Sequence, residues 1–422
     1  MRKSSRRRTL AFTSAAASVV LLALAGCSSG SGSSGSSAPS GSSAPAAGTP
    51  LSLTIEDYYP VGTMTANYDK IYKACAAAEG DTITPSHVPG PSLITKVLQQ
   101  ETSRTLPDVL MLDNPDVQQI ASSGALTPLS DYGITGNGVE QEVLAAGSLN
   151  GKLYGLAPGV NSLGLFYNKD KLAAAGLTPP TTWAELASDA KKLSGNGKYG
   201  FAFAGTNTYE GTWQFLPWMW SNGGTERQLN SPQNAQALDF LASLVKDGSV
   251  SASVVGWGQG DALNQFIAGK AAMMENGPWN IPALKAVKGL NFGYVPIPAN
   301  AAGQKSVAPL GGETFTVPNT GNTAKEAAAG KIVACINSPE NENAIAAENN
   351  YIPSTPTIAA AFGKSNPDLA PFVSIVADAR SRTGLLGTKW PTVATEIYKA
   401  EQLALTGKAT GAAALAQVAA SS

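Results

Sequence analysis

Histidine is almost absent from this chain of 422 residues, in which His87 is the only one. Cysteine is scarce too, and its three residues form no cluster with one another or with His87. A zinc site needs about four closely spaced ligands, so we expect no metal centre. No motif pairs a nucleophile with a base, and we therefore expect a protein that is not an enzyme and has no cofactor.

The sequence also lacks an excess of charge of either sign. Its 29 basic and 30 acidic residues give a net charge of −1, and no basic patch lies beyond the extreme N-terminus. Binding to nucleic acid is therefore not expected. The long apolar run at Leu10–Ala25 is too short and too alanine-rich to span a bilayer comfortably. The chain is long enough for two domains with cores of their own.

Residues 1–27 have the form of an export signal, since a cluster of basic residues precedes the apolar run. Leu24-Ala25-Gly26-Cys27 resembles a bacterial lipobox, which implies cleavage before Cys27 and lipidation of that cysteine. The alternative is an ordinary signal peptide with an incidental cysteine. Ser5-Arg6-Arg7 leaves both Sec and twin-arginine export open. Residues 28–50 are almost wholly Ser, Gly, Ala and Pro, which predicts a disordered tether.

Strand and helix patterns alternate from residue 51 onward, which predicts a parallel sheet. The expected strands are Leu51–Ile55, Asp81–Thr84 and Asp108–Leu112, and the expected helices are Ala66–Ala78 and Ser92–Ser103. Polar and aromatic residues follow two of these strands, at Asp57-Tyr58 and Asp113-Asn114. Side chains at the carboxyl ends of such strands are typical of an α/β binding crevice.

The stretch Phe266–Trp279 organises the second half of the chain. Asp261–Ala268 is predicted to be a helix that Gly269 ends, because glycine enters the left-handed region without strain. Ala271–Met274 suits a buried strand, and Gly277-Pro278 then breaks that strand before Trp279. The ring of Trp279 either forms the floor of a cleft or belongs to the core.

Several motifs occur in an order that resembles one known family. They are PDVLMLD at 107–113, LGLFYNKDKLAAAGL at 163–177, PPTTWAEL at 179–186, Gly223-Gly224, and F-x-x-G-x-x-A-M followed by G-x-W at 266–279. Together they resemble the extracellular solute-binding proteins of ABC importers, and in particular the maltose-binding-protein class that serves carbohydrate uptake. The likeness covers residues 51–410. In Thr182-Trp183-Ala184-Glu185 we also expect a capping box at the start of a helix.

The resemblance implies a two-lobe α/β fold, with a mainly parallel sheet flanked by helices in each lobe and three crossings between the lobes. Lobe one is expected to hold residues 51–160 and 309–350, and lobe two residues 161–308 and 351–422. The ligand would be a sugar or oligosaccharide held in the cleft between the lobes. The partner would be an ABC permease, and the chain a monomer anchored to the outer face of the cytoplasmic membrane of a Gram-positive bacterium.

Aromatic rings can cover the apolar face of a pyranose, while carboxylates and amides bind its hydroxyls. The candidate ligand-binding residues are Asp57, Tyr58, Asp113, Asn114, Glu210, Trp213, Trp257, Trp279, Glu313 and Trp390. We expect Glu313 either to point at the cleft mouth or to be an exposed carboxylate on a turn. Leu112 stands where maltose-binding protein has a tryptophan, which puts maltodextrin specificity in doubt.

Three alternatives stay open at this point. The ligand could be another small polar solute, such as a polyol, a phosphorylated polyol or a polyamine. A lipid-anchored glycoside hydrolase would also use carboxylates and tryptophans, at a spacing that the sequence does not reveal. Cys75 and Cys335 both map to helices of lobe one and, after export, either form a disulfide or stay separate buried thiols.

Overall fold

The computed structural model describes residues 49–59 and 63–420, and from Pro50 onward the chain forms one compact unit. The expected export signal, Cys27 and residues 28–48 of the expected tether lie outside the described residues. Within the described ranges, no helix has both the length and the apolar character that crossing a membrane requires.

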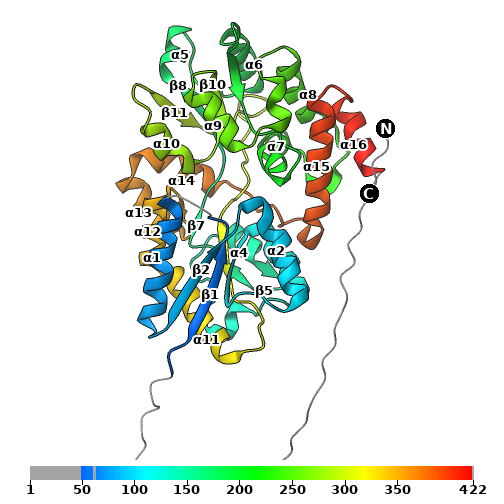
Figure 1. Cartoon of the computed structure of the whole chain (residues 1–422). Coiled ribbons are helices and arrows are strands. Elements are labelled where there is room, and N and C mark those ends of the chain that lie inside the picture. The colour runs from blue at the N-terminus through cyan, green and yellow to red at the C-terminus, as the bar shows by residue number, and fades with distance from the viewer. Residues whose placement is uncertain (1–48, 60–62, 421–422) are drawn as a thin grey trace, which may run out of the picture. The chain divides into compact units, whose positions relative to one another are not determined.

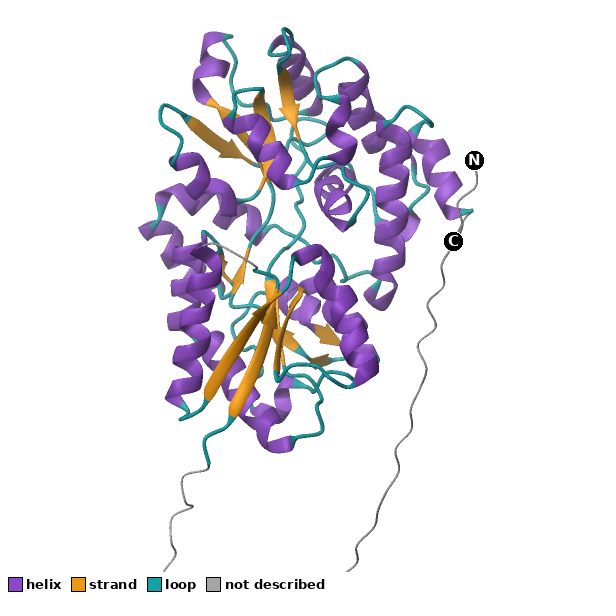
Figure 2. Ribbon diagram, viewed as in Figure 1, coloured by secondary structure: helices purple, strands orange, loops and turns teal. Residues whose placement is uncertain are grey.

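The strands, drawn in orange in Figure 2, form two main sheets. The first has five strands in the order β2-β1-β3-β12-β6. Their bounds are β1 Ser52–Asp57, β2 Thr82–His87, β3 Val109–Asp113, β6 Gly155–Leu156 and β12 Glu313–Thr316. The pairs β1–β2 and β1–β3 are parallel, as the alternating pattern predicted. β12 runs antiparallel to both β3 and β6, and Glu313 lies opposite Asp113. β12 therefore begins at the sheet edge where β3 ends.

Helices cover this first sheet on both sides of its strands. They are α1 Thr63–Ala78, α2 Gly90–Ser103, α3 Val117–Ser122, α4 Gln141–Gly147, α11 Thr323–Ile336 and α12 Pro339–Asn349. α1 packs against β2, α11 and α12 (Figure 1). Its Tyr68 and Tyr72 are buried against Phe315 of β12. The core thus joins chain segments from both halves of the sequence.

The second main sheet has four strands in the order β11-β8-β10-β9. Their bounds are β8 Gly164–Asn168, β9 Tyr199–Ala202, β10 Ala271–Asn276 and β11 Phe292–Val295. Only β9 and β10 are parallel, while β8 is antiparallel to β10 and β11. Counted by direction rather than by neighbouring pairs, four of the five strands in the first sheet and three of the four in the second run the same way, and β12 and β8 are the exceptions. The expectation of a mainly parallel sheet in each lobe is therefore confirmed. β12 and β8 each follow a segment that connects the two sheets. β12 begins opposite the end of β3, and β8 begins opposite the end of β10, so each runs antiparallel to that neighbour.

Ten helices within the described residues accompany the second sheet. They are α5 Lys169–Ala174, α6 Trp183–Lys192, α7 Tyr209–Ser221, α8 Pro232–Lys246, α9 Gln259–Ile267, α10 Ile281–Lys285, α13 Pro356–Ser365, α14 Ala370–Ala377, α15 Trp390–Leu405 and α16 Gly411–Ala419. α15 packs against α7, α8 and α16 (Figure 1). The capping box of α6 is confirmed, because Thr182 and Glu185 bind each other's backbone N–H. Gly269, at φ 68°, follows the end of α9 as predicted.

Three segments that connect the two sheets lie side by side. β7 (Gly159–Val160) pairs with β13 (Ile352–Pro353), and Asn161 forms a bridge with Gly311. A short hairpin, β4 (Ser148–Leu149) with β5 (Lys152–Leu153), precedes the first connection. We keep the expected limits of the two lobes as a proposal. Every strand of the first sheet falls in the expected lobe one, and every strand of the second sheet in the expected lobe two.

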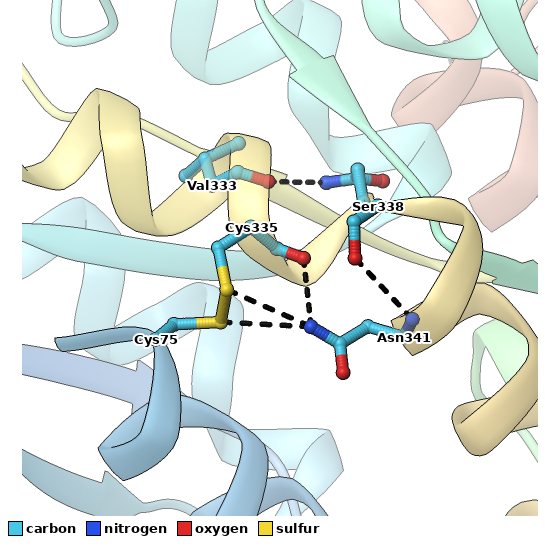
Figure 3. Close-up of a disulfide and its surroundings, with 6 residues drawn as sticks. Cys75, Val333, Cys335, Ser338 and Asn341 are labelled. Atoms are coloured by element: carbon cyan, nitrogen blue, oxygen red, sulfur yellow. Dashed lines mark hydrogen bonds between the residues drawn. A yellow bond between two sulfur atoms is a disulfide. The ribbon is translucent and has the colours of Figure 1, made fainter. Parts of the chain in front are cut away.

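A disulfide joins Cys75 of α1 to Cys335 of α11, with 5.7 Å between the Cα atoms. Of the two alternatives left open for these cysteines, the structure therefore has the bridge. Figure 3 shows Asn341 beside it, where the side-chain amide donates to the carbonyl of Cys335 at 2.8 Å and lies 3.6 Å from both sulfurs. The bridge fastens the segment that re-enters the first sheet to the helix that follows β1.

Candidate functional site

Asp113 and Asn114 occupy the carboxyl end of β3, as the sequence predicted. The Asp113 carboxylate accepts the backbone N–H of Asn114 at 2.9 Å and so begins the short helix η1, Asn114–Asp116. The Asn114 side chain donates to the carbonyl of Leu310 at 3.0 Å. The end of β3 is therefore fixed to a segment that connects the two sheets.

Arg382 binds both of these residues from the loop between α14 and α15. Its guanidinium group donates to the two carboxylate oxygens of Asp113 at 2.9 and 2.5 Å, and to the Asn114 side chain at 2.9 Å. The Arg382 side chain is buried, whereas that of Asp113 is about one-third exposed. A planar fork on a carboxylate fixes orientation as well as charge. This contact joins the end of the first sheet to a loop that belongs with the second.

Trp213 of α7 lies under the same guanidinium group, whose carbon is 4.5 Å from the ring centre. The ring borders a cavity of about 30 Å³. That volume holds about one water molecule and is too small for a sugar ring. The lining residues are Asp113, Pro115, Asp116, Tyr209, Trp213, Arg382, Trp390, Pro391 and Ala394. We call this the central cavity. A solute can enter only if the lobes open or Arg382 moves off the ring.

Asp116, which lines the central cavity, has a carboxyl group whose pKa is far above the usual value for aspartate. Burial raises the pKa of its carboxyl group to about 7, the negative charge of Asp113 adds to the rise, and Arg382 partly offsets it. Asp116 therefore changes its charge near neutral pH. A protonated Asp116 can donate a hydrogen bond that a carboxylate cannot.

Glu313 lies beside this region, directly opposite Asp113. The expectation of an exposed carboxylate on a turn was wrong, while a position at the cleft mouth stays a prediction. Glu313 is the first residue of β12 and only 4% exposed, because the strand pairing carries it into the sheet. It accepts hydrogen bonds from the hydroxyls of Tyr58 at 2.6 Å and Tyr351 at 3.1 Å. Burial raises the pKa of Glu313, and its Oε2 has no hydrogen-bond partner among the described residues. Tyr58 and Glu313 thus form one polar cluster, and a hydroxyl donor from a solute would complete it.

Asp57 does not join Asp113, although both end strands of the same sheet. Its side chain is buried and accepts hydrogen bonds from the Tyr72 hydroxyl and the Tyr59 backbone N–H. His87 Nδ1 lies 2.7 Å from Oδ1 of Asp57, the oxygen that also accepts the Tyr59 N–H. His87 is the last residue of β2 and lies directly opposite Asp57. Asp57 is therefore held within the first sheet and does not line the central cavity.

Among the other candidates, Trp390 lines the central cavity, whereas Glu210, Trp257 and Trp279 do not. Trp390 is the first residue of α15 and packs in the core of the second sheet. Glu210 accepts the backbone N–H of Gln259 at the start of α9. Trp257 and Trp279 are half-buried, and the Trp279 ring covers Gly277 closely enough to exclude a Cβ there.

Sequence reasoning missed Arg382, Asp116 and Tyr209. Arg382 is 269 residues from Asp113 along the chain, and a lone arginine in a loop carries no local signal. Asp116 stands three positions after Asp113, in the same polar turn, and could have been included on that ground. In residues 49–59 and 63–420, no three His, Cys, Asp or Glu side chains form a group that could hold a metal ion.

Comparison with known proteins gives these features a context. The profile of a family described as bacterial extracellular solute-binding protein matches residues 70–371. A binding protein of Brucella abortus is 26% identical over 84% of this chain and 88% of its own length. The maltooligosaccharide ABC transporter solute-binding lipoprotein of Streptococcus pneumoniae is 28% identical over 62% of each chain.

A solved structure covers nearly the whole described unit. The cyclic alpha-maltosyl-1,6-maltose binding protein from Arthrobacter globiformis superposes with a TM-score of 0.74 and 27% identity. The match covers 88% of this chain and 97% of that one. The expected fold class, a two-lobe α/β binding-protein fold, is thereby confirmed.

Proposed function

This chain belongs to the bacterial extracellular solute-binding proteins, and we propose that it captures a sugar or oligosaccharide for an ABC importer. The observation that carries the proposal is the central cavity, where Trp213 and Trp390 meet Asp113, Asp116 and a guanidinium fork. Indole faces suit the apolar face of a pyranose, and the polar groups suit its hydroxyls. The names of the Streptococcus pneumoniae and Arthrobacter globiformis proteins, both sugar binders, support the same ligand class.

Capture proceeds by exchange of Arg382 for the solute. When the lobes part, Arg382 leaves the Trp213 ring, and the sugar stacks where the guanidinium lay. Asp113 and Asn114 then turn from Arg382 to the sugar hydroxyls. The Arg382 Nε–H has no hydrogen-bond partner among the described residues, so it supplies one further donor. Closure follows only if the sugar makes better contacts in the closed state than in the open one.

Trp279 and Trp257 are the second pair of rings in the proposal. Both are half-buried, and both pack against the cluster of buried residues that includes Phe266 and Ile281. We propose that Trp279 stacks on a further part of the sugar when the cleft is open. Glu210 would orient that part of the site through α9, whose first N–H it binds.

Cys27 provides the proposed attachment to the membrane. Cleavage before Cys27 and its lipidation would hold the protein on the outer face of the cytoplasmic membrane, within reach of a permease. The Streptococcus pneumoniae relative is named a lipoprotein, which supports the proposal. Cys27→Ala should leave the protein unprocessed or release it from membranes. Mass spectrometry that finds no acyl group on the mature N-terminal cysteine would rule this anchor out.

The family and the relatives named here are binding proteins. We propose further that this chain is a monomer that binds without turning over its ligand. Incubation with oligosaccharides should leave them intact. Hydrolysis that disappears when Asp113 or Asp116 is replaced by the corresponding amide would overturn this and favour a glycoside hydrolase.

The direct experiment is a thermal-shift screen of the protein lacking residues 1–48, with calorimetry of the hits. The panel holds mono- and oligosaccharides, polyols, phosphorylated polyols and polyamines. A ligand that binds only the folded state raises Tm. We expect a sugar to do so and a polyamine not to. Stabilisation by a phosphorylated polyol or a polyamine, and by no sugar, would replace the proposed ligand class.

A further inference from the structure

A groove of about 660 Å³ opens on the surface beside the central cavity, and Tyr209 and Pro391 line both. Its volume lies within the usual range of small-molecule sites. Most of its wall is one face of α15, where lining residues recur every three or four positions from Pro391 to Leu403. Twelve helical steps make that wall about 18 Å long, several times the width of one pyranose ring. We call this the α15 groove.

We propose that the α15 groove holds the continuation of an oligosaccharide whose first units sit in the central cavity. This rests on the proposed function and extends it, since it makes the preferred ligand a chain of several sugar units. Tyr209 and Pro391 line both spaces and form the wall between them, so a ligand that extends past these two residues from the central cavity reaches the α15 groove.

Tyr209 has the properties of a platform for a sugar ring. At 43% exposure, it and Leu98 are the two large apolar side chains that stay exposed among residues 49–59 and 63–420. It is nevertheless held in place, since its hydroxyl donates to the Pro391 carbonyl at 3.4 Å and its ring lies 6.0 Å from that of Tyr398. A fixed and exposed aromatic ring loses little conformational freedom when it binds.

The polar groups of the groove are free to bind hydroxyls. The side chains of Asn207, Thr392, Glu396 and Lys399 form no hydrogen bond or ion pair with any other residue in the described part of the chain. Glu396 and Lys399 carry opposite charges three residues apart on α15, so the groove has no net charge from this pair. That composition suits a neutral polyhydroxyl chain and gives a phosphorylated ligand no cluster of cations.

The test uses the full chain in detergent and a length series of maltooligosaccharides, with galactooligosaccharides as a second series. Calorimetry gives the affinity ratio between the hexasaccharide and the disaccharide. For the wild type we expect the hexasaccharide to bind more tightly. The double variant Asn207→Ala/Lys399→Ala should lose about tenfold in hexasaccharide affinity, the size of two modest hydrogen bonds, and keep its disaccharide affinity.

Controls distinguish this inference from the proposed function. Lys408→Ala removes an exposed lysine just beyond α15 and should change neither affinity. Both substituted groove residues are exposed, so the double variant should keep the wild-type Tm. If the wild type bound the hexasaccharide and the disaccharide equally well, or if the double variant lost the same affinity for both, the proposed role of the α15 groove would be refuted. The proposal of sugar binding would stand. Failure of every sugar to bind the wild type would refute the proposed function and the groove with it.

Discussion

The guanidinium carbon of Arg382 lies 4.5 Å from the centre of the Trp213 ring, on the face that a sugar would need. The same guanidinium group makes three hydrogen bonds to Asp113 and Asn114 at the end of β3. One arginine therefore covers the aromatic surface and also holds the first sheet to the loop before α15. The contacts of Arg382 that hold the first sheet to this loop therefore also place its guanidinium group over the Trp213 ring.

Replacing Arg382 by Met should loosen this closed arrangement. The substitution removes the three hydrogen bonds that the guanidinium group donates. Asp113, whose side chain is about one-third exposed, can replace the two that it accepts with hydrogen bonds from water. We expect the free energy of unfolding to fall by about 1–3 kcal/mol. Amide hydrogen exchange in residues 381–389 should also become faster.

The matched control is Arg227→Met. Arg227 also reaches this loop, by donating to the Leu385 carbonyl at 3.2 Å, but its side chain is exposed and contacts neither Asp113 nor Trp213. It should change stability by less than about 0.5 kcal/mol. Equal effects of the two variants would show that Arg382 adds nothing beyond an ordinary surface contact.

Trp213→Ala should weaken sugar binding more than it weakens the fold. A buried aromatic anchor contributes on the order of 2 kcal/mol or more to binding. Trp183→Ala is the contrasting variant. Trp183 stacks on Phe240 and donates to the Pro298 carbonyl inside the second core, so its loss should cost about 3–5 kcal/mol of stability with little effect on affinity. Calorimetry and melting curves of both proteins separate the roles, and an unchanged affinity in Trp213→Ala would remove it from the site.

Asp116 should make ligand affinity depend on pH. Its pKa is about 7 in the closed cavity, whereas a solvated aspartate has a pKa near 4. Closing the cleft therefore takes up a proton below pH 7. Sugar affinity should rise as pH falls from 7 to 5, by at most about tenfold per pH unit. Asp116→Asn should flatten the profile and exposed Asp131→Asn should not. A wild-type affinity that is constant over this range would contradict the assignment.

The sequence predicted local structure well wherever local chemistry decides it. The Thr182–Glu185 capping box, the stop at Gly269 and the polar end of β3 at Asp113-Asn114 are all properties of a few neighbouring residues. The sheet order was harder, because β12 pairs with β3 across 200 residues, and alternation along the chain does not encode the direction of that pairing. The expectation of parallel strands therefore failed only for β12 and β8, each of which follows a segment that connects the two sheets.

The candidate site residues show the same difference between local signals and packing of distant segments. Asp113, Asn114, Trp213 and Trp390 come together around the central cavity. Asp57 looked equivalent to Asp113 in sequence, yet Tyr72 and His87 bind it inside the first sheet. The difference lies in which helix covers each strand end, and packing between distant elements decides that. Arg382 could not be found from sequence for the same reason.

Glu275 predicts a second pH effect, on stability and away from the cleft. It is fully buried in β10 and accepts the Trp218 indole N–H at 2.8 Å. Burial raises its pKa well above the usual value, and burial together with Glu275 raises that of Glu401. The folded state thus holds protons that the unfolded chain releases near pH 4.5. Stability should fall as pH rises above that value, until these groups ionise in the folded state.

Glu275→Gln keeps an acceptor for Trp218 and removes the buried acid. Its melting temperature should vary less with pH than that of the wild type. At pH 8 it should be more stable by about 1–3 kcal/mol, the cost of a poorly satisfied buried polar group. Glu340→Gln, at an exposed position, is the matched control and should follow the wild type. A parallel pH profile for Glu275→Gln and the wild type would mean that Glu275 does not retain its proton on folding.

The disulfide between Cys75 and Cys335 should stabilise the first sheet strongly, because it closes a loop across 260 residues of sequence. The chain leaves this sheet after β6 and returns only at β12. Without the bridge, the unfolded chain therefore gains the conformational entropy of the long loop between the two cysteines. The loop-entropy model gives an upper value of about 5 kcal/mol. Cys75→Ser/Cys335→Ser should therefore lower Tm markedly, and a reductant should lower the wild-type Tm toward the variant's while leaving the variant unchanged. Thiol titration of the denatured, unreduced protein lacking residues 1–48 should detect no free thiol. Two reactive thiols there would show that the bridge does not form.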